Sequence, residues 1–137
     1  MLMDSAGNSG SQASVTIIRG LSLGELEFRD LPKIVWKEIR VAVLCGISLA
    51  MVCFVKILVI DRWLLGNTGI TLQIDLVVCI TLAITVLFAK IVGAVLPLLA
   101  QKLGFDPTVM ASPFITTIVD ALSLLVYFTV ATSILPV

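Results

Sequence analysis

The sequence contains no histidine, only three cysteines and few charged residues, and each shortage excludes a class of function. Without histidine there is no imidazole for metal binding, for acid–base catalysis or for sensing pH near neutrality. Cys45, Cys53 and Cys79 lie inside apolar runs without CxxC spacing, and an odd number does not suit a disulfide framework. Nine basic residues balance nine acidic ones, so the chain lacks the positive charge of a nucleic-acid-binding protein.

What the sequence has in abundance is apolar side chains. Hydrophobic residues make up 59% of the 137 positions and charged residues 13%, with a mean hydropathy of +1.16. A soluble domain of this size cannot bury so much apolar surface. A backbone in lipid must satisfy its hydrogen bonds internally, and the alternating pattern of barrel strands is absent, so the spans are expected to be helices. The expected fold class is an all-α membrane protein.

Three apolar runs are long enough to be transmembrane helices: residues 36–60, 74–100 and 112–135. Each exceeds the ~20 residues that a helix needs to cross ~30 Å of hydrocarbon. Residues 1–19 are rich in glycine and serine and too short to span alone, so they are predicted to be the end of a fourth helix. Residues 20–35 form a polar connector. The whole chain, residues 1–137, is thus predicted to be one partial transmembrane domain.

The distribution of lysine and arginine predicts the orientation in the membrane. Basic residues cluster in the connector and the entry to the next helix: Arg19, Arg29, Lys33, Lys37 and Arg40. The loop at 61–73 carries only Arg62, and the loop at 101–110 carries Lys102. Three alternating crossings put the connector 20–35 and the loop 101–110 on one side. The positive excess predicts that this side is cytoplasmic and that the C-terminus lies outside.

Polar residues follow one line along the last apolar run. Ser112, Thr116 and Asp120 are spaced by four, so they share one face of a helix. Asp120 lies roughly 12 Å into that helix at 1.5 Å per residue. An ionised aspartate at mid-membrane costs ~2.5–3.5 kcal/mol on insertion scales. A purely structural helix does not require that cost, so Asp120 points to a partner charge or to water.

Three explanations of Asp120 are open at this point. It could line a pore that handles cations, because a carboxylate with hydroxyl oxygens is a hard ligand set suited to Mg²⁺ or Ca²⁺. It could form an ion pair with Lys90, the only basic residue deep inside the other spans. It could also be a protonated acid that donates a hydrogen bond or moves protons. A two-fold dimer would bring two Asp120 carboxylates to the axis and suit a hydrated dication.

The N-terminal segment AGNSGSQ supplies a second polar surface. Gly7 allows close approach of its backbone to another helix or to a hydrated ion, and Ser11 lies on the same helical face. Asn8 and Gln12 contribute further polar atoms. The segment is not a phosphate-binding loop, because no GK[ST] follows it. Asp4, just before it, is either an intramembrane acid or a helix cap.

Small residues recur every four positions on the first two spans: Ala42, Gly46 and Ala50 on the first, and Ala89, Gly93 and Pro97 on the second. Faces of this kind let helix backbones approach closely in a membrane. The sequence therefore predicts close helix packing along both of these faces.

Three segments together resemble the membrane domain of the MgtE family of magnesium transporters and channels: AGNSGSQASVTIIRGLSLGEL, LPKIVWKEIRVAV and AKIVGAVLPLLAQKLGFDPTVMASPFITTIVD. Their order, their spacing and the PFITT stretch before Asp120 agree, and the resemblance covers the chain from Asp4 onward. It implies a membrane domain of five helices per subunit that works as a homodimer with the pore on the two-fold axis. This chain would hold the end of the second helix and the third, fourth and fifth.

The resemblance also implies roles for individual residues. Asp120 matches the pore aspartate that binds a hydrated Mg²⁺. The pore-lining positions fall on five residues: Ser112, Thr116, Gly7, Asn8 and Ser11. From the residues themselves, Lys90, Thr117 and Gln12 are candidates for an ion pair with the ligand or for a supporting position behind it. Mg²⁺ is the expected cargo, with Mn²⁺, Co²⁺ and Ca²⁺ as further candidates.

The resemblance also implies a soluble N-terminal domain, paired CBS domains and a first membrane helix, none of which we expect within these 137 residues. The chain is either a piece of a longer protein or a short natural one, and a separate chain could supply the missing parts. We expect Mg²⁺ transport through a dimeric, channel-like pore driven by the membrane potential. The alternatives are a non-conducting assembly or accessory subunit and a proton-coupled carrier using Asp120 and Lys90. No enzyme is expected, because no nucleophile–base arrangement is present.

Overall fold

The computed structural model describes residues 2–64, 66, 72–110 and 112–134, with the backbone alone at 60–62, 64, 72, 73, 110 and 112. Within these ranges every regular element is a helix, which confirms the all-α class. Three helices are long and apolar enough to cross a membrane: Phe28–Val59, Ile74–Lys102 and Pro113–Ile134. The chain therefore has the expected architecture of a helical membrane protein.

Four α-helices and three short helical segments follow one another: α1 (Leu2–Ser22), η1 (Phe28–Asp30), α2 (Leu31–Lys56), the π-helical η2 (Ile57–Leu64), α3 (Leu72–Lys102), η3 (Pro107–Met110) and α4 (Ser112–Ile134). α2 begins ahead of residue 36, where the apolar run begins, because Pro32 at its start pre-sets a helical φ. α1 runs to Ser22, η1 lies within the connector and α2 begins at Leu31, so much of the connector predicted at 20–35 is helical.

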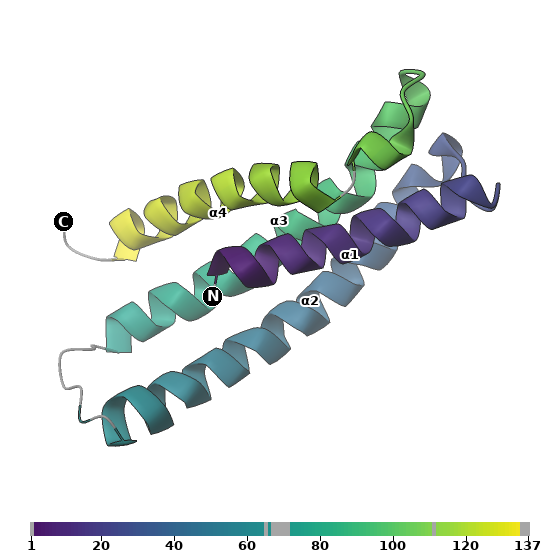
Figure 1. Ribbon diagram of the computed structural model, residues 1–137. Coiled ribbons are helices and arrows are strands. Elements are labelled where there is room, and N and C mark those ends of the chain that lie inside the picture. The colour runs from purple at the N-terminus through teal and green to yellow at the C-terminus, as the bar shows by residue number, and fades with distance from the viewer. Residues whose placement is uncertain (1, 65, 67–71, 111, 135–137) are drawn as a thin grey trace.

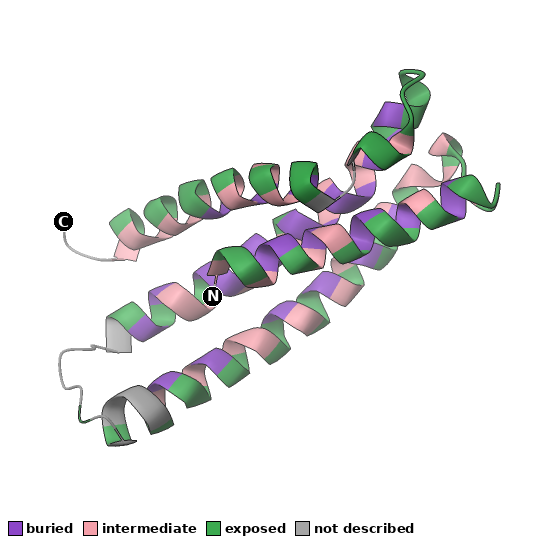
Figure 2. Cartoon of the chain, viewed as in Figure 1, coloured by how far each residue is buried: buried purple, intermediate pink, exposed green. Residues whose placement is uncertain are grey.

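α3 is the central helix of the bundle. It packs against α1, α2 and α4, and 44% of its apolar stretch is buried, compared with 22% for those of α2 and α4. In Figure 1, α2 lies on one side of α3 and α4 on the other, and α1 begins part-way along the bundle. Figure 2 shows that buried residues follow the sides of α1 and α3 that face the bundle interior. The N-terminal turns of α1 therefore lie near the middle of α4.

α1 and α3 cross with their backbones in contact. A Cβ at Gly93 would overlap the carbonyl oxygen of Gly10, and a Cβ at Gly10 would come within 3.0 Å of the carbonyl oxygen of Ala89. α2 approaches α3 in a similar way, because a Cβ at Gly46 would lie 3.2 Å from the Cα of Ala83. Both predicted small-residue faces are therefore helix–helix contacts.

Glycine ends two of the long helices. Gly24 follows α1 with a φ of +70°, and Gly104 follows α3 with a φ of +83°. Only glycine adopts this left-handed conformation without strain, and it allows the final carbonyls of a helix to be satisfied. The amide of Phe105 donates to the carbonyl of Ala100 at 2.9 Å in this way. Both helices therefore end where the sequence supplies a glycine.

The connector after α1 and the segment after α3 lie at the same end of the bundle (Figure 1). The ammonium group of Lys102 sits 4.1 Å from the centre of the Phe28 ring and links the two. In η3, the carboxylate of Asp106 accepts the amide of Thr108 at 2.9 Å, and this hydrogen bond lowers the pKa of Asp106 below its usual value. Both connections are thus ordered by local contacts.

Candidate cation-binding site

Asp120 lies on the edge of α4 that borders α1. On the neighbouring face of α4, Ile115 and Val119 are buried against α1 and α3 and hold the orientation of the helix. Asp120 and Thr116 are only half-buried. The Thr116 hydroxyl donates to the carbonyl of Pro113 at 3.0 Å, which ties its side chain to its own helix. Thr116 and Asp120, whose side chains are described, therefore lie beside the apolar contacts of α4 and not among them.

Residues from α1 and α4 enclose one hollow of about 250 Å³: Met3, Asp4, Gly7, Asn8, Thr116 and Asp120. Four of these were singled out by the sequence as pore-lining or ion-binding, and the structure brings them together from opposite ends of the chain. The remaining polar member is Asp4, for which the sequence left two interpretations open. Asp4 shares the hollow with Asp120, so two carboxylates lie on its walls.

Gly7 lets the backbone of α1 approach the Asp120 turn. A Cβ at Gly7 would lie 3.3 Å from Thr116 Cγ2 and 3.8 Å from Asp120 Oδ1. Because glycine leaves that space empty, no side chain stands between the α1 backbone and the carboxylate. The hollow owes its room to this one position.

The polar side chains around this hollow carry carboxylate, hydroxyl or amide groups, whose oxygen atoms can act as metal ligands. Carboxylate, hydroxyl and amide oxygens are the ligands that Mg²⁺ and Ca²⁺ prefer. Within the described parts of the chain, no three acidic or cysteine side chains are grouped closely enough to hold a bare metal ion.

A second hollow, of about 530 Å³, continues along the same face of α1. Its lining consists of Asn8, Ser11, Gln12, Val15 and Thr16, so Asn8 belongs to both hollows. The hydroxyl oxygen of Ser11 is buried without a hydrogen-bond partner, and Thr16 donates to the carbonyl of Gln12 at 2.9 Å. The predicted residues Ser11 and Gln12 therefore lie next to the Asp120 hollow, not within it.

Lys90 takes a partner that the sequence did not suggest. Its Nζ lies 3.6 Å from Oε2 of Glu38 on α2, and both side chains are only 8% exposed. Among the residues whose side chains are described, no ion pair joins Lys90 to Asp120. The reason is geometric: Lys90 reaches from α3 to α2, whereas α4 packs on another side of α3 (Figure 1).

One sequence signal could have found Glu38. The buried residues of α2 include Ile34, Glu38, Ala42 and Gly46, which are spaced by four. Extending the predicted small-residue face by one turn toward the N-terminus therefore reaches Glu38. A buried acid in a membrane helix commonly pairs with a base, and Lys90 is the only buried lysine among the described residues.

Two further predicted residues remain, Thr117 and Ser112. Thr117 is exposed, and its hydroxyl donates to the carbonyl of Pro113 at 2.9 Å. The side chain of Ser112 lies outside the described residues. The role predicted for Ser112 therefore stays a prediction.

Comparison with known proteins identifies the family. The sequence profile of MgtE, described as a divalent cation transporter, matches residues 1–130. The chain is 35% identical over 131 residues to the magnesium transporter MgtE of Thermus thermophilus, covering 96% of this chain and 27% of that protein. It is 32% identical over 133 residues to the magnesium transporter MgtE of Bacillus subtilis, covering 97% of this chain and 28% of that protein. The chain thus spans about a quarter of the length of these relatives, and it belongs to the MgtE family of divalent cation transporters.

Proposed function

We propose that this chain forms part of a pathway that carries Mg²⁺ across a membrane, with the ion held in its water shell at Asp120. The observation that supports this most directly is the hollow between α1 and α4, where Asp120, Thr116 and Asn8 surround a space of about 250 Å³. Its relatives are named magnesium transporters. Thr116 and Asn8 contact the water shell, and Asp120 supplies the charge.

The pathway is completed by a second copy of the chain. One aspartate per chain gives little charge for a dication, whereas a two-fold axis beside α4 doubles the number of Asp120 carboxylates. The half-exposed position of Asp120 leaves it accessible from that side. Water on the axis offsets the cost of placing a carboxylate at membrane depth. The working unit we propose is therefore a homodimer.

The membrane potential is the driving force in this proposal. A dication that moves inward across 100 mV gains roughly 4.6 kcal/mol, twice the value for a single charge. We place the connector and the 101–110 loop in the cytoplasm, because they lie at the same end of the bundle (Figure 1) and, with the adjoining helix ends, carry six of the nine basic residues: Arg19, Arg29, Lys33, Lys37, Arg40 and Lys102. The C-terminus is then outside.

Flux measured in proteoliposomes tests the proposal. The purified chain is reconstituted with an Mg²⁺-sensitive dye inside, and a potassium gradient with valinomycin sets the potential. We expect Mg²⁺ uptake that rises when the interior is made negative and that is unchanged when a pH gradient is collapsed. Uptake that follows the pH gradient would instead support a proton-coupled carrier. No uptake under any potential would support an accessory subunit and overturn transport by this chain.

Filling the space at Gly7 is expected to obstruct the path. Gly7→Ala places a Cβ 3.3 Å from Thr116 Cγ2 and needs only a small shift, whereas Gly7→Val also extends toward Asp120. We expect Gly7→Val to lower Mg²⁺ uptake at least tenfold, equivalent to about 1.4 kcal/mol, and Gly7→Ala to lower it less. Dye-based flux is the measurement. Ser22→Val, on the exposed end of α1, is the control and should keep its flux.

A further inference from the structure

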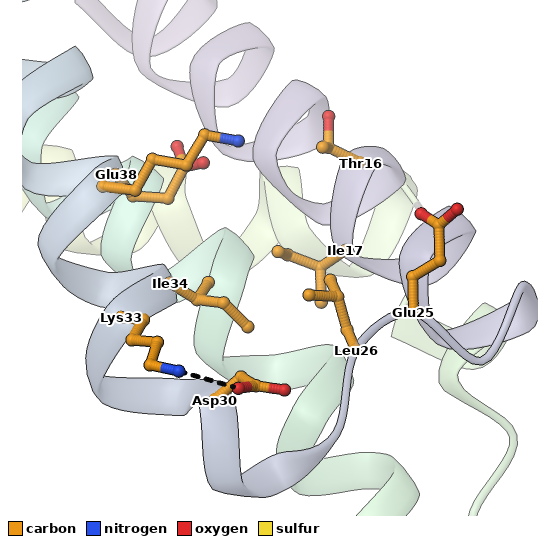
Figure 3. A pocket seen from close by; sticks show the side chains of 9 residues that line it. Thr16, Ile17, Glu25, Leu26, Asp30, Lys33, Ile34 and Glu38 are labelled. Carbon is orange, nitrogen blue, oxygen red and sulfur yellow. Dashed lines mark ion pairs between the residues drawn. The ribbon is translucent and has the colours of Figure 1, made fainter.

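Glu38, the partner of Lys90, lines a third hollow, about 260 Å³ in volume, at the connector end of α1 and α2. Figure 3 shows Thr16 and Ile17 on one wall and Lys33, Ile34 and Glu38 on another. Glu25 and Asp30 of the connector complete its acidic lining. This hollow is separate from the one at Asp120 and has no part in the ion binding proposed there.

The three hollows follow one another along α1. The Asp120 hollow shares Asn8 with the second, and the second shares Thr16 with the third. In the route that we infer, an ion that leaves Asp120 along this face of α1 would pass the second hollow and reach the wall that Glu38 forms. The carboxylates of Asp120 and Glu38 stand at the two ends of this series.

The two carboxylates differ in their counter-charge. Glu38 is more than nine-tenths buried and faces an ammonium group at 3.6 Å, supplied by α3. Asp30, in the connector, pairs instead with the exposed Lys33 at 3.7 Å, drawn as the dashed line in Figure 3. A buried carboxylate without its ammonium partner would bind a divalent cation and hold it. Conduction requires each site to bind weakly enough for the ion to leave.

We propose that Lys90 is a tethered counter-cation that occupies Glu38 and so prevents the connector end of the ion path from retaining a divalent cation. The inference rests on the proposed function at Asp120 and adds to it that the ion leaves Asp120 along the polar face of α1. Removal of Lys90 would turn Glu38 into a binding site for Mg²⁺. Removal of Glu38 would leave an unpaired ammonium group, which repels Mg²⁺. If Mg²⁺ does not reach Glu38, the pair only joins two helices, and neither removal produces a response to Mg²⁺.

Thermal unfolding of the detergent-solubilised full chain, with and without Mg²⁺, distinguishes these cases. All variants carry Asp120→Asn, so that binding at Asp120 does not contribute. The test variants are Lys90→Met and Lys90→Gln, which leave Glu38 charged and unpaired. The comparison variants are Glu38→Gln and the double variant Glu38→Gln/Lys90→Met. The matched control is Lys37→Met, which removes a lysine that lines the same hollow without unpairing Glu38.

We expect the Tm of both Lys90 variants to rise by about 5–10 °C when Mg²⁺ reaches about one hundred times its Kd, because the ion replaces the lost ammonium group. Glu38→Gln, the double variant and Lys37→Met should show no Mg²⁺-dependent rise. If neither Lys90 variant responds more than the Asp120→Asn parent, the proposal is overturned, and an equal rise in the double variant overturns it as well. Because this experiment measures no flux, its outcome is independent of whether Asp120 carries transport.

Discussion

Replacement of Asp120 by asparagine is expected to abolish Mg²⁺ uptake while the chain stays folded. Asparagine has nearly the same shape and keeps an oxygen, but it removes the charge that attracts the dication at the α1–α4 hollow. A loss of at least 100-fold, equivalent to about 2.8 kcal/mol, is the expected size of the effect. An ionised aspartate costs ~2.5–3.5 kcal/mol at mid-membrane, so removing its charge should not destabilise the helix bundle.

Flux and unfolding must therefore be measured on the same preparations. Asp120→Glu keeps the charge and should retain part of the uptake, because the longer side chain still reaches the water shell. Asp106→Asn is the matched control: it removes a carboxylate from an exposed turn, and asparagine can still accept the amide of Thr108. Full uptake by Asp120→Asn, with normal uptake by the control, would remove Asp120 from the ion path.

The sequence predicted the spans well because the cost of polar groups in lipid makes apolar runs easy to recognise. The structure has helices long and apolar enough to cross a membrane close to all three predicted runs. Helix starts were harder, because α2 begins at Leu31, inside the segment that appeared to be a polar connector. Side chains such as Lys33 are exposed there, so a helical turn outside the membrane carries no hydropathy signal.

Part of the site also followed from sequence. The spacing of four between Thr116 and Asp120 is a local helical property, so their shared face could be predicted from α4 alone. Their meeting with Gly7 depends on how α1 packs against α4, and only the family resemblance indicated it before the structure. The resemblance gave no sign that Asp4 would share the hollow with Asp120.

The ion-pair partner of Lys90 could not be predicted from the sequence. Glu38 and Lys90 lie on different helices, and which acid faces which base depends on the rotation of each helix about its axis. That rotation is set by backbone contacts such as those of Gly46 with Ala83, which single-sequence patterns suggest but do not align. The sequence therefore placed Lys90 correctly within a span and offered Asp120 as a partner, whereas packing brought Glu38.

Replacement of Gly93 by valine should prevent the four helices from packing together. A Cβ at Gly93 overlaps the carbonyl oxygen of Gly10, and a backbone atom cannot move aside as a flexible side chain can. Gly10 in turn has Ile115 and Val119 of α4 close by, at 3.1 and 3.2 Å from a Cβ built on it. Pushing α1 off α3 therefore also separates α1 from the Asp120 turn.

We expect Gly93→Val to lower the free energy of unfolding by at least about 3 kcal/mol, the upper end of the usual range for overpacking, and Gly93→Ala to lower it less. Folded yield after extraction and thermal unfolding in detergent measure the effect. Gly104→Ala is the matched control, because a Cβ there meets nothing within 4 Å and costs only about 1 kcal/mol of left-handed backbone strain. If Gly93→Val loses no more stability than Gly104→Ala, the backbone contact between α1 and α3 does not hold the bundle together. Mg²⁺ uptake by Gly93→Val should then survive.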